Sequence, residues 1–162
     1  MRINNSKIKN TILTAYFLLL FAVILGMIVF GLFRTWITNS TLKYGVFVVF
    51  FVLLFLVLLK VAKYFEYDSD GHVLVLINRG FIISEYINYG GKKAEFPKKK
   101  LIYYKLTKRF LFYKSLNLYI KSSDNEHHQK RIKFNVSLVS RKKLKYLRMS
   151  LDKVVKQNKA NR

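Results

Sequence analysis

The sequence of 162 residues has no cysteine, a single proline and only eight acidic residues. The absence of cysteine excludes disulfides, a thiolate nucleophile and zinc sites built on thiolates. The acidic residues are scattered, so their spacing does not predict a pair of catalytic carboxylates. Neither a glycine-rich phosphate loop, a serine–histidine–aspartate set nor a lysine-bearing P-loop is visible. The sequence therefore predicts a protein that is not an enzyme and that has no metal site and no cofactor.

Two adjacent histidines, His127 and His128, lie near Asp124 and Glu126 in a polar segment. Neighbouring residues on a loop rarely converge on one metal ion without a third ligand, and the chain offers no cysteine to supply it. We therefore interpret this segment as an exposed loop.

Charge is also scarce in two long apolar segments in the first part of the chain. Segment 11–33 has no charged residue, and segment 44–62 has only Lys60, whose long stem can reach toward a membrane surface. A helix needs about 20 apolar residues to cross a bilayer core. We therefore predict a transmembrane helical hairpin over residues 11–62, preceded by a tail at 1–10. The alternative for the first segment is a signal peptide, whose apolar core is usually about 7–15 residues long.

The distribution of lysine and arginine predicts the orientation of this hairpin. Arg2, Lys7 and Lys9 precede the first helix and a basic segment follows the second, whereas the middle of the connecting loop, 35–42, is uncharged. Positively charged flanks stay on the cytoplasmic side of a membrane. We expect a multi-pass protein of the inner (cytoplasmic) membrane with both termini in the cytoplasm. Because ionisable residues are absent from the middle of both helices, ion or proton transport is not expected.

The remaining residues, 63–162, are expected to form one small cytoplasmic domain rich in β-strands. Short β-prone segments separated by turns follow one another there, and several show the period-two alternation of a strand with one wet face. No helical pattern interrupts them, which predicts an antiparallel arrangement. The seven predicted strands are residues 64–67, 72–78, 81–88, 92–96, 101–108, 116–121 and 131–136.

The alternation also predicts which side chains face the interior of the domain. Asn117 is expected on the wet face of its strand. The inward residues are Ile102, Tyr104 and Leu106, then Leu116, Leu118 and Ile120, then Ile132, Phe134 and Val136.

An amphipathic helix is predicted after the last strand, at about 140–157. Ser140 is a suitable N-cap because its hydroxyl can accept a hydrogen bond from the first helical turn. Apolar residues then recur at i, i+3, i+7 and i+10, on one face of a helix. These are Leu144, Leu147, Leu151 and Val154. Since the strands and the helix share an apolar set, residues 64–162 are expected to fold without the hairpin.

The order of these elements resembles a known family. The hairpin leads into Tyr64-Phe65-Glu66-Tyr67-Asp68, segments 101–108 and 116–121 form a strand pair, and 134–140 opens a helix that begins with Arg141-Lys142-Lys143-Leu144. In this order the chain is similar to the bacterial pleckstrin-homology-like (PH-like) domains that follow one or two transmembrane helices. The resemblance implies an α+β fold in which seven antiparallel strands form an open barrel and the C-terminal helix caps one end. The alternative is an unrelated small barrel or sandwich with a C-terminal helix.

Eukaryotic members of that superfamily hold phosphoinositides with basic residues around the first hairpin. The corresponding turn here, Asp68-Ser69-Asp70-Gly71, is acidic, so specific inositide recognition is not expected. The basic residues lie elsewhere: from Lys60 onward the net charge is +17, within a total of +22. Pro97 should present the lysines that follow it on a loop. The predicted lipid- or partner-binding residues are Lys92, Lys93, Lys98, Lys99, Lys100, Lys108, Arg109 and Lys114.

A basic surface held beside a bilayer predicts attraction to anionic headgroups. We therefore expect a non-enzymatic, membrane-anchored adaptor or binding module that docks to an anionic lipid surface or to a protein partner. A solvated polar face, enriched in lysine by coding bias, is the plainer explanation of the charge. Two other functions stay open. In an accessory subunit of a larger membrane complex, Gly26 and Gly31 would mark helix packing. A membrane tether for nucleic acid would use the mixed aromatic and basic residues of 108–114, a segment also typical of a hairpin turn.

Overall fold

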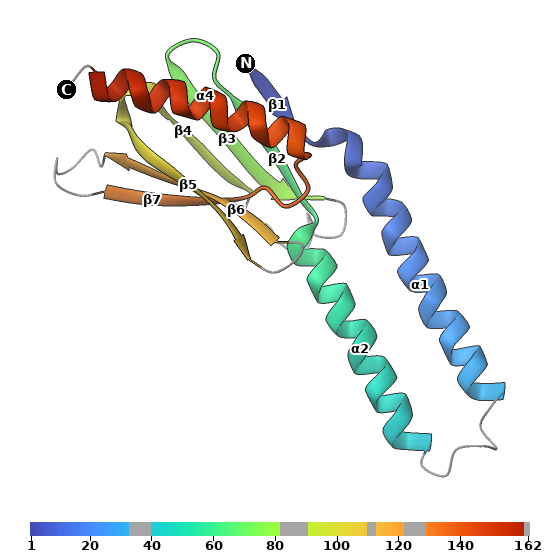
Figure 1. The fold of residues 1–162 in the computed structure, drawn as a ribbon. Coiled ribbons are helices and arrows are strands. Elements are labelled where there is room, and N and C mark those ends of the chain that lie inside the picture. Colours follow the sequence, from blue (N-terminus) through green and yellow to red (C-terminus); the bar gives the residue numbers. More distant parts are fainter. Residues whose placement is uncertain (33–39, 82–90, 110–112, 122–128, 161–162) are drawn as a thin grey trace.

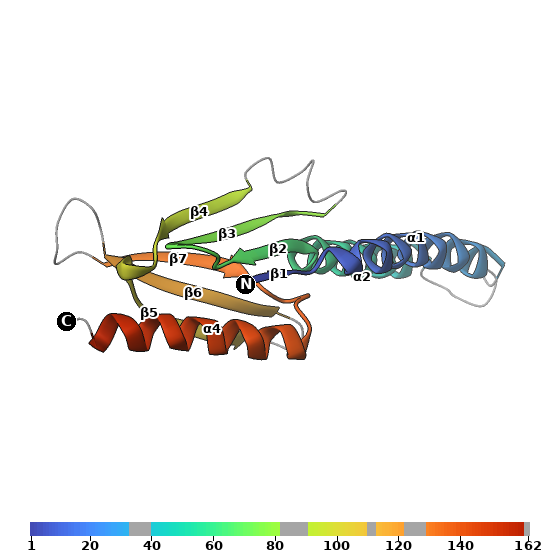
Figure 2. The same ribbon diagram turned by 90° about the horizontal axis from the view of Figure 1, so that it is seen from above.

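The computed structural model describes residues 1–32, 40–81, 91–109, 113–121 and 129–160 of the chain. It shows an α+β protein in two parts, a pair of long apolar helices and a β-rich domain (Figure 1). The helices project from one end of the domain in both views (Figures 1 and 2). The domain contains two antiparallel sheets and a long C-terminal helix.

The two apolar helices have the length and composition needed to cross a membrane. Helix α1 comprises Lys9–Leu32 and helix α2 comprises Ser40–Val61, and at 1.5 Å per residue each exceeds the roughly 30 Å of a bilayer core. Only 11% and 6% of their most apolar stretches are buried inside the protein. A helix that is apolar all round and still uncovered suits a lipid environment. The two predicted helices are therefore present, although α2 begins earlier than predicted.

A glycine of α1 lies at the contact between the two helices. A Cβ atom placed on Gly26 of α1 would lie 2.1 Å from the ring Cζ of Phe47 in α2. At Gly31 the same Cβ would meet nothing within 4 Å among the described residues. Of the two glycines expected to mark helix packing, only Gly26 therefore lies at the contact between these helices.

The first sheet contains four antiparallel strands in the order β1-β2-β3-β4. They are β1 Arg2–Asn4, β2 Lys63–Asp68, β3 Val73–Gly80 and β4 Lys92–Pro97. In the turn between β2 and β3, Gly71 has a φ of 65°, a left-handed conformation that glycine adopts without steric cost. The tight turn predicted at residues 68–71 is thus confirmed.

The second sheet contains three antiparallel strands, β5 Leu101–Arg109, β6 Tyr113–Lys121 and β7 Gln129–Asn135. A short 3-10 helix, η3 (Lys98–Lys100), connects β4 to β5. The described strands make two sheets and no closed barrel, so the seven-stranded open barrel expected from the sequence is not confirmed.

Strand β1 differs from what the sequence predicts, because residues 1–10 were expected to be a tail. Instead β1 pairs with β2, and Ile3 is buried in the core with 5% of its surface exposed. A strand of three residues has a single inward side chain, too few for a period-two pattern to be visible. The apolar set of residues 64–162 is therefore incomplete without β1. The strand predicted at 81–88 lies outside the described residues apart from Phe81, which follows the end of β3.

Helix α4 comprises Arg141–Ala160 and packs on the sheets with the apolar stripe that the sequence predicts. Ser140 caps it as expected, since its Oγ accepts a hydrogen bond from the backbone N–H of Lys143 at 3.4 Å. The helix extends slightly beyond the predicted end. The core residues of the stripe are Leu147, Leu151 and Val154, with Leu144 packed beside them.

Hydrogen bonds join α4 to both sheets. The Tyr67 hydroxyl on β2 lies 2.9 Å from the Oγ of Ser150. The Tyr104 hydroxyl on β5 donates to the Oδ1 of Asp152 at 2.7 Å. Burial, together with this hydrogen bond, raises the pKa of Tyr104 to about 12. The helix is therefore held by polar contacts at its edges as well as by its apolar stripe.

Two positions in the second sheet differ from the prediction, one in its direction and one in its burial. Leu101 is fully buried because the β5–β6 register shifts between Leu101 and Tyr103, and such a bulge turns a side chain to the other face. Asn117 is only 1% exposed although it points to the outer face. It lies on the central strand, and its Oδ1 accepts hydrogen bonds from Arg131 at 3.0 and 3.3 Å. Neighbouring side chains cover Asn117, and the alternation of residues along one strand does not predict such cover.

Candidate functional site

Both apolar helices enter the domain at the same end, without an intervening loop. Helix α2 ends at Val61 and β2 begins at Lys63, so only Ala62 lies between them. Ala62 is fully buried, and its carbonyl accepts a hydrogen bond from the backbone N–H of Phe81 at 3.3 Å. A 3-10 turn, η1 (Ser6–Ile8), connects β1 directly to α1. The domain is therefore fixed close to the ends of the helices (Figure 1).

The strand registers decide which basic residues lie at this end of the domain, called the helix end from here on. Because β2 begins there, its antiparallel neighbour β3 ends there, with Lys63 opposite Gly80, and Lys92 begins the next strand. In the second sheet β5 ends and β6 begins at the helix end, with Arg109 opposite Tyr113. The opposite end, where β4 passes into η3, is called the far end.

Two asparagines tie both sheets to α2 at the helix end. The Nδ2 of Asn78 donates to the carbonyls of Tyr64 at 2.8 Å and Asn135 at 2.9 Å, and its Oδ1 accepts from the backbone N–H of Asn135 at 3.2 Å. The Nδ2 of Asn135 donates to the carbonyl of Lys60 at 2.7 Å, and its Oδ1 accepts from the N–H of Ser137 at 2.9 Å. A fully paired polar network of this kind favours one arrangement of its parts.

A cleft of about 900 Å³ lies beside this network, between the last turns of α2 and the ends of both sheets. We call it the helix-end cleft. One wall is apolar and belongs to α2, whereas the sheets contribute basic side chains. Among the described residues no carboxylate lines it. Its apolar wall consists of Leu56, Val57, Leu59 and Val61, and its cations are Lys60, Lys63, Arg79, Lys92, Arg109 and Lys133.

No cation of this cleft forms an ion pair with an acid among the described residues, although Arg79 is near enough to Glu66 to help lower the pKa of that carboxyl. The ion pairs among the described residues join the N-terminal amine to Asp70, Arg2 to Glu66, and Lys93 to Glu95. All three pairs lie outside the cleft. Its positive charge is therefore available to an anion.

Aromatic rings hold two of these cations without cancelling their charge. The guanidinium of Arg79 lies 4.8 Å from the ring centre of Tyr64, and the Nζ of Lys133 lies 5.2 Å from that of Tyr113. Such cation–π contacts orient a side chain and leave it charged. Burial lowers the pKa of Lys63, because partial removal from water disfavours the ammonium form. An anion bound nearby would relieve that cost.

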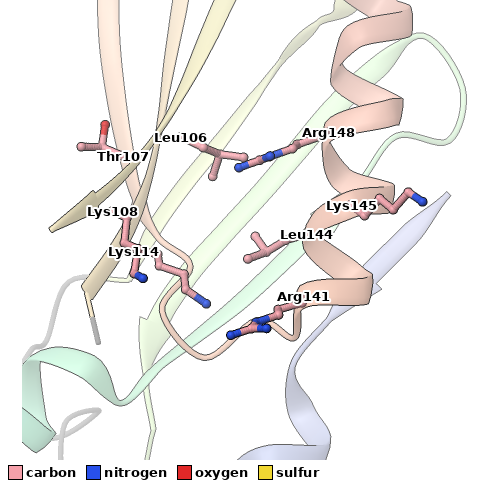
Figure 3. A pocket seen from close by; sticks show the side chains of 8 residues that line it. All are labelled: Leu106, Thr107, Lys108, Lys114, Arg141, Leu144, Lys145 and Arg148. Atoms are coloured by element: carbon pink, nitrogen blue, oxygen red, sulfur yellow. The ribbon is translucent and has the colours of Figure 1, made fainter. Parts of the chain in front are cut away.

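A second basic pocket, of about 480 Å³, lies between α4 and the helix end of β5 and β6. We call it the α4 pocket. In Figure 3, Arg141 and Arg148 point from α4 toward the strands, Lys108 and Lys114 lie opposite, and Lys145 points away. Again no carboxylate lines it among the described residues. Leu106, Thr107 and Leu144 complete the lining.

The structure divides the eight predicted binding residues into groups. Lys92 and Arg109 line the helix-end cleft, while Lys108 and Lys114 line the α4 pocket. Lys93 pairs with Glu95 at 3.0 Å. The three lysines of η3 lie at the far end, about 20 Å from the helix end along a strand of six residues. They form a 3-10 turn rather than an open loop.

One of these lysines takes part in the structure of the far end. The Nζ of Lys98 donates to the carbonyl of Gly71 at 2.6 Å, and its backbone carbonyl accepts from Asn158 at 2.7 Å. At a Debye length of about 8–10 Å, charges roughly 20 Å from a leaflet are largely screened from it. If the apolar helices cross a bilayer, the three lysines lie too far from it for strong attraction, and their role in binding stays a prediction.

The predicted set omits residues of both pockets that the tertiary structure brings together, among them Arg141, Lys145 and Arg148 of the α4 pocket. Lys60, Lys63, Arg79 and Lys133 complete the helix-end cleft but are separated by up to 73 positions in the chain. Two signals in the sequence point to three of these four residues. Lys60 and Lys63 flank the end of an apolar helix, and Arg79 immediately precedes the glycine that ends a strand.

The outer face of the second sheet carries a separate group of aromatic and basic residues. The rings of Tyr103 and Tyr119 are stacked, with centres 4.0 Å apart and planes inclined by 11°. The guanidinium of Arg131 lies 5.9 Å from the ring centre of Tyr119. Tyr103 is 41% exposed, so one face of this stack is accessible. We call this group the tyrosine platform.

No group of three histidine, cysteine, aspartate or glutamate side chains that could hold a metal ion occurs among the described residues. His127 and His128 lie outside them. Comparison of the chain with known protein families, curated proteins and solved structures finds no match. The features that indicate a function are therefore the two basic pockets, the apolar helices beside them and the tyrosine platform.

Proposed function

We propose that the protein is a non-enzymatic, membrane-anchored adaptor whose helix end docks on the anionic surface of the membrane. Helices α1 and α2 cross the inner membrane as a hairpin, and the β-rich domain lies in the cytoplasm with both termini. The charge bias around the helices supports this orientation. The adaptor binds headgroups directly, and its far end stays available to a protein partner.

Two contacts favour a membrane hairpin over a signal peptide. Ile12 and Tyr16 of α1 are buried against a cluster that includes Leu59, Ala62 and Tyr64. In addition, β1 precedes α1 and belongs to the first sheet. Cleavage after α1 would remove a strand and part of the packing from the folded domain.

The observation that carries the proposal is the position of the charge. Eleven lysine and arginine residues line the two pockets at the helix end, and α2 leaves the domain at that same end. If α2 crosses the bilayer, these side chains lie at the headgroup level. Each lysine or arginine near an anionic leaflet contributes roughly 1 kcal/mol. The hairpin has already brought the domain to the surface, so even a few such contacts would set its tilt.

The fold agrees with the proposed PH-like class in its composition. Among the described residues there are seven antiparallel strands and one C-terminal amphipathic helix, and the acidic turn at 68–71 lies at the far end. One strand precedes the apolar helices rather than following them. In this proposal the hairpin is an insertion between the first and second strands of the domain.

Docking can be tested on the full chain in lipid nanodiscs. Because the chain has no cysteine, Lys142→Cys places a single fluorophore near the helix end, and Lys99→Cys places one at the far end. A nitroxide quencher attached to lipid headgroups reports proximity to the bilayer. We expect quenching at position 142 to rise when about 30% phosphatidylglycerol replaces phosphatidylcholine and to fall between about 0.05 and 0.5 M salt.

The label at position 99 is the internal control and should respond little to either change. If quenching at position 142 changes with neither lipid charge nor salt concentration, the docking proposal is overturned. Labelling of Asn39→Cys by an impermeant reagent in intact cells or spheroplasts tests the orientation. Access to position 39 only from the cytoplasm would overturn that part of the proposal.

The tyrosine platform favours a second candidate, a membrane tether for single-stranded nucleic acid. Bases stack on exposed aromatic rings, and each such contact is worth about 1–3 kcal/mol. We expect Tyr103→Ala to weaken binding of a labelled oligouridine to the full chain in neutral nanodiscs at least about fivefold. Tyr146→Ala, at an exposed tyrosine of α4, is the control. Failure of the wild-type protein to retain the oligonucleotide at about 0.15 M salt removes this candidate.

A further inference from the structure

We propose that the helix-end cleft is a stoichiometric site for one anionic phospholipid. The phosphate of the lipid lies among the cations of the sheets, and its acyl chains lie along α2. The inference rests on the proposed function in requiring α2 to cross the bilayer. It goes further, because surface docking needs only a diffuse positive charge and predicts no one-to-one complex.

The walls of the cleft have the two chemistries that a phospholipid requires. Leu56 and Val57 are 48% and 51% exposed on α2 and form part of the lining. Within the same cleft, Lys63, Arg79 and Lys133 come from strands of both sheets. An apolar strip next to a group of cations matches the acyl chains and the anionic headgroup of a phospholipid. A free phosphate would use the cations alone and leave the apolar wall without a ligand.

The cleft is also rigid enough to select one ligand. The hydrogen bonds of Asn78 and Asn135 fix the two sheets to each other and to the carbonyl of Lys60. Ala62 joins the apolar wall to the basic wall without a loop. Because these walls are already held in place, little ordering is needed on binding, and such preorganisation favours affinity. The volume, about 900 Å³, is within the range of small-molecule sites.

The electrostatic balance favours an anion over a zwitterion. The cations of the cleft have no carboxylate partners among the described residues, and a choline group would add another positive charge. Phosphatidylglycerol offers the phosphate without that cation. It is therefore expected to bind more tightly than phosphatidylcholine of the same acyl composition.

Native mass spectrometry of the full chain in detergent tests this directly. With phosphatidylglycerol added, we expect one lipid adduct per chain, and phosphatidylcholine should produce it only at much higher concentration. Lys63→Gln with Lys133→Gln removes two cations of the cleft and should weaken the adduct about thirtyfold. Arg79→Gln with Lys92→Gln, at two exposed positions, repeats the test if the first pair does not fold. Lys153→Gln with Lys156→Gln, an equal loss of charge on exposed α4, should leave binding unchanged.

Several results would overturn the lipid site. Equal adducts from the two lipids, several adducts without a preferred one, or equal weakening by the α4 control pair would mean general adhesion. If glycerol 3-phosphate competes as effectively as the lipid, the cleft is a phosphate site.

Nanodisc quenching at Lys142→Cys separates this inference from docking. When the cleft variants are made in the labelled Lys142→Cys protein, a lost adduct with retained quenching supports the specific site. If the labelled protein with an intact cleft keeps the adduct but is not quenched, only the docking proposal is overturned.

Discussion

The side-chain amide of Asn135 donates a hydrogen bond to the backbone carbonyl of Lys60 at 2.7 Å. The last turn of a helix leaves its carbonyls without helical partners, so a strand from the distant second sheet here satisfies one of them. This contact ties the end of the apolar helix to the second sheet, in addition to the direct passage from α2 into β2 through Ala62. The geometry of the helix-end cleft therefore depends on it.

We expect Asn135→Ala to destabilise the protein by about 2 kcal/mol, because it leaves the carbonyl of Lys60 and the N–H of Ser137 without partners. Thermal unfolding in detergent measures the loss. Lys130→Ala, at an exposed position of the same strand, is the control and should change stability by less than about 0.5 kcal/mol. Equal effects of the two substitutions would contradict the role of the asparagine.

The N-terminal strand should be required for full stability of the domain. Ile3 lies in the core, and the side chain of Asn5 bonds the backbone of Phe65 at 2.9 Å and of Lys63 at 3.0 Å. We expect Ile3→Asp to cost about 3 kcal/mol or more, since it buries a charge. Ser6→Asp, at an exposed position of the same segment, is the control.

A soluble protein without the hairpin tests the same strand independently. Joining residues 1–8 to 62–162 through a short glycine–serine linker keeps β1 beside β2. We expect this chain to unfold cooperatively and at higher urea than residues 63–162 alone, because the linker keeps the missing strand close. Identical unfolding midpoints for the two chains would show that β1 contributes nothing to the domain.

The packing of the helices should depend on Gly26. We expect Gly26→Leu to push Phe47 aside and widen the hairpin, since a Cβ there already overlaps the ring, at a cost of about 1–3 kcal/mol for overpacking. Spin labels at exposed Val29 and Val46 report the separation. Gly31→Leu is the matched control, and adding Phe47→Ala to Gly26→Leu should restore the original distance. An unchanged distance in the Gly26 variant would refute the contact.

Acid should weaken the attachment of β1 through Glu66. Its carboxylate accepts hydrogen bonds at 2.6 Å from the hydroxyl of Tyr64 and from Arg2, and these hold the pKa of Glu66 below its ordinary value of 4.5. A lowered folded-state pKa stabilises the protein above the unfolded pKa, and this contribution is lost as the pH falls through the folded value. The stability advantage over Glu66→Gln should shrink between about pH 6 and pH 3.

Urea unfolding of both proteins across that range measures the effect. Glu95→Gln, which removes an exposed carboxylate from the same sheet, shows the general effect of losing one acidic residue. A difference between wild type and Glu66→Gln that stays constant with pH would contradict the assigned hydrogen bonds.

Local patterns in the sequence were sufficient for the elements that depend on neighbouring residues. Uninterrupted apolarity predicts α1 and α2, and the spacing of Leu147, Leu151 and Val154 predicts the buried face of α4. Strands β2 to β7 follow from short alternating segments and from the turns between them. In each case the pattern, one apolar face or a helix that is apolar all round, repeats along a few adjacent turns or residues.

The tertiary structure alone decided the position of β1 and the composition of the helix-end cleft. Ile3 pairs opposite Tyr67, and Lys60 meets Asn135, across separations of more than 60 residues. Local periodicity in the sequence does not predict such pairings, because sheet register and edge position depend on which distant strands pair in the folded protein. The same pairing sends Lys98 to the far end while it brings Lys63 and Lys133 together. The amount of positive charge is thus determined by the sequence, whereas its concentration at the helix end is determined by the fold.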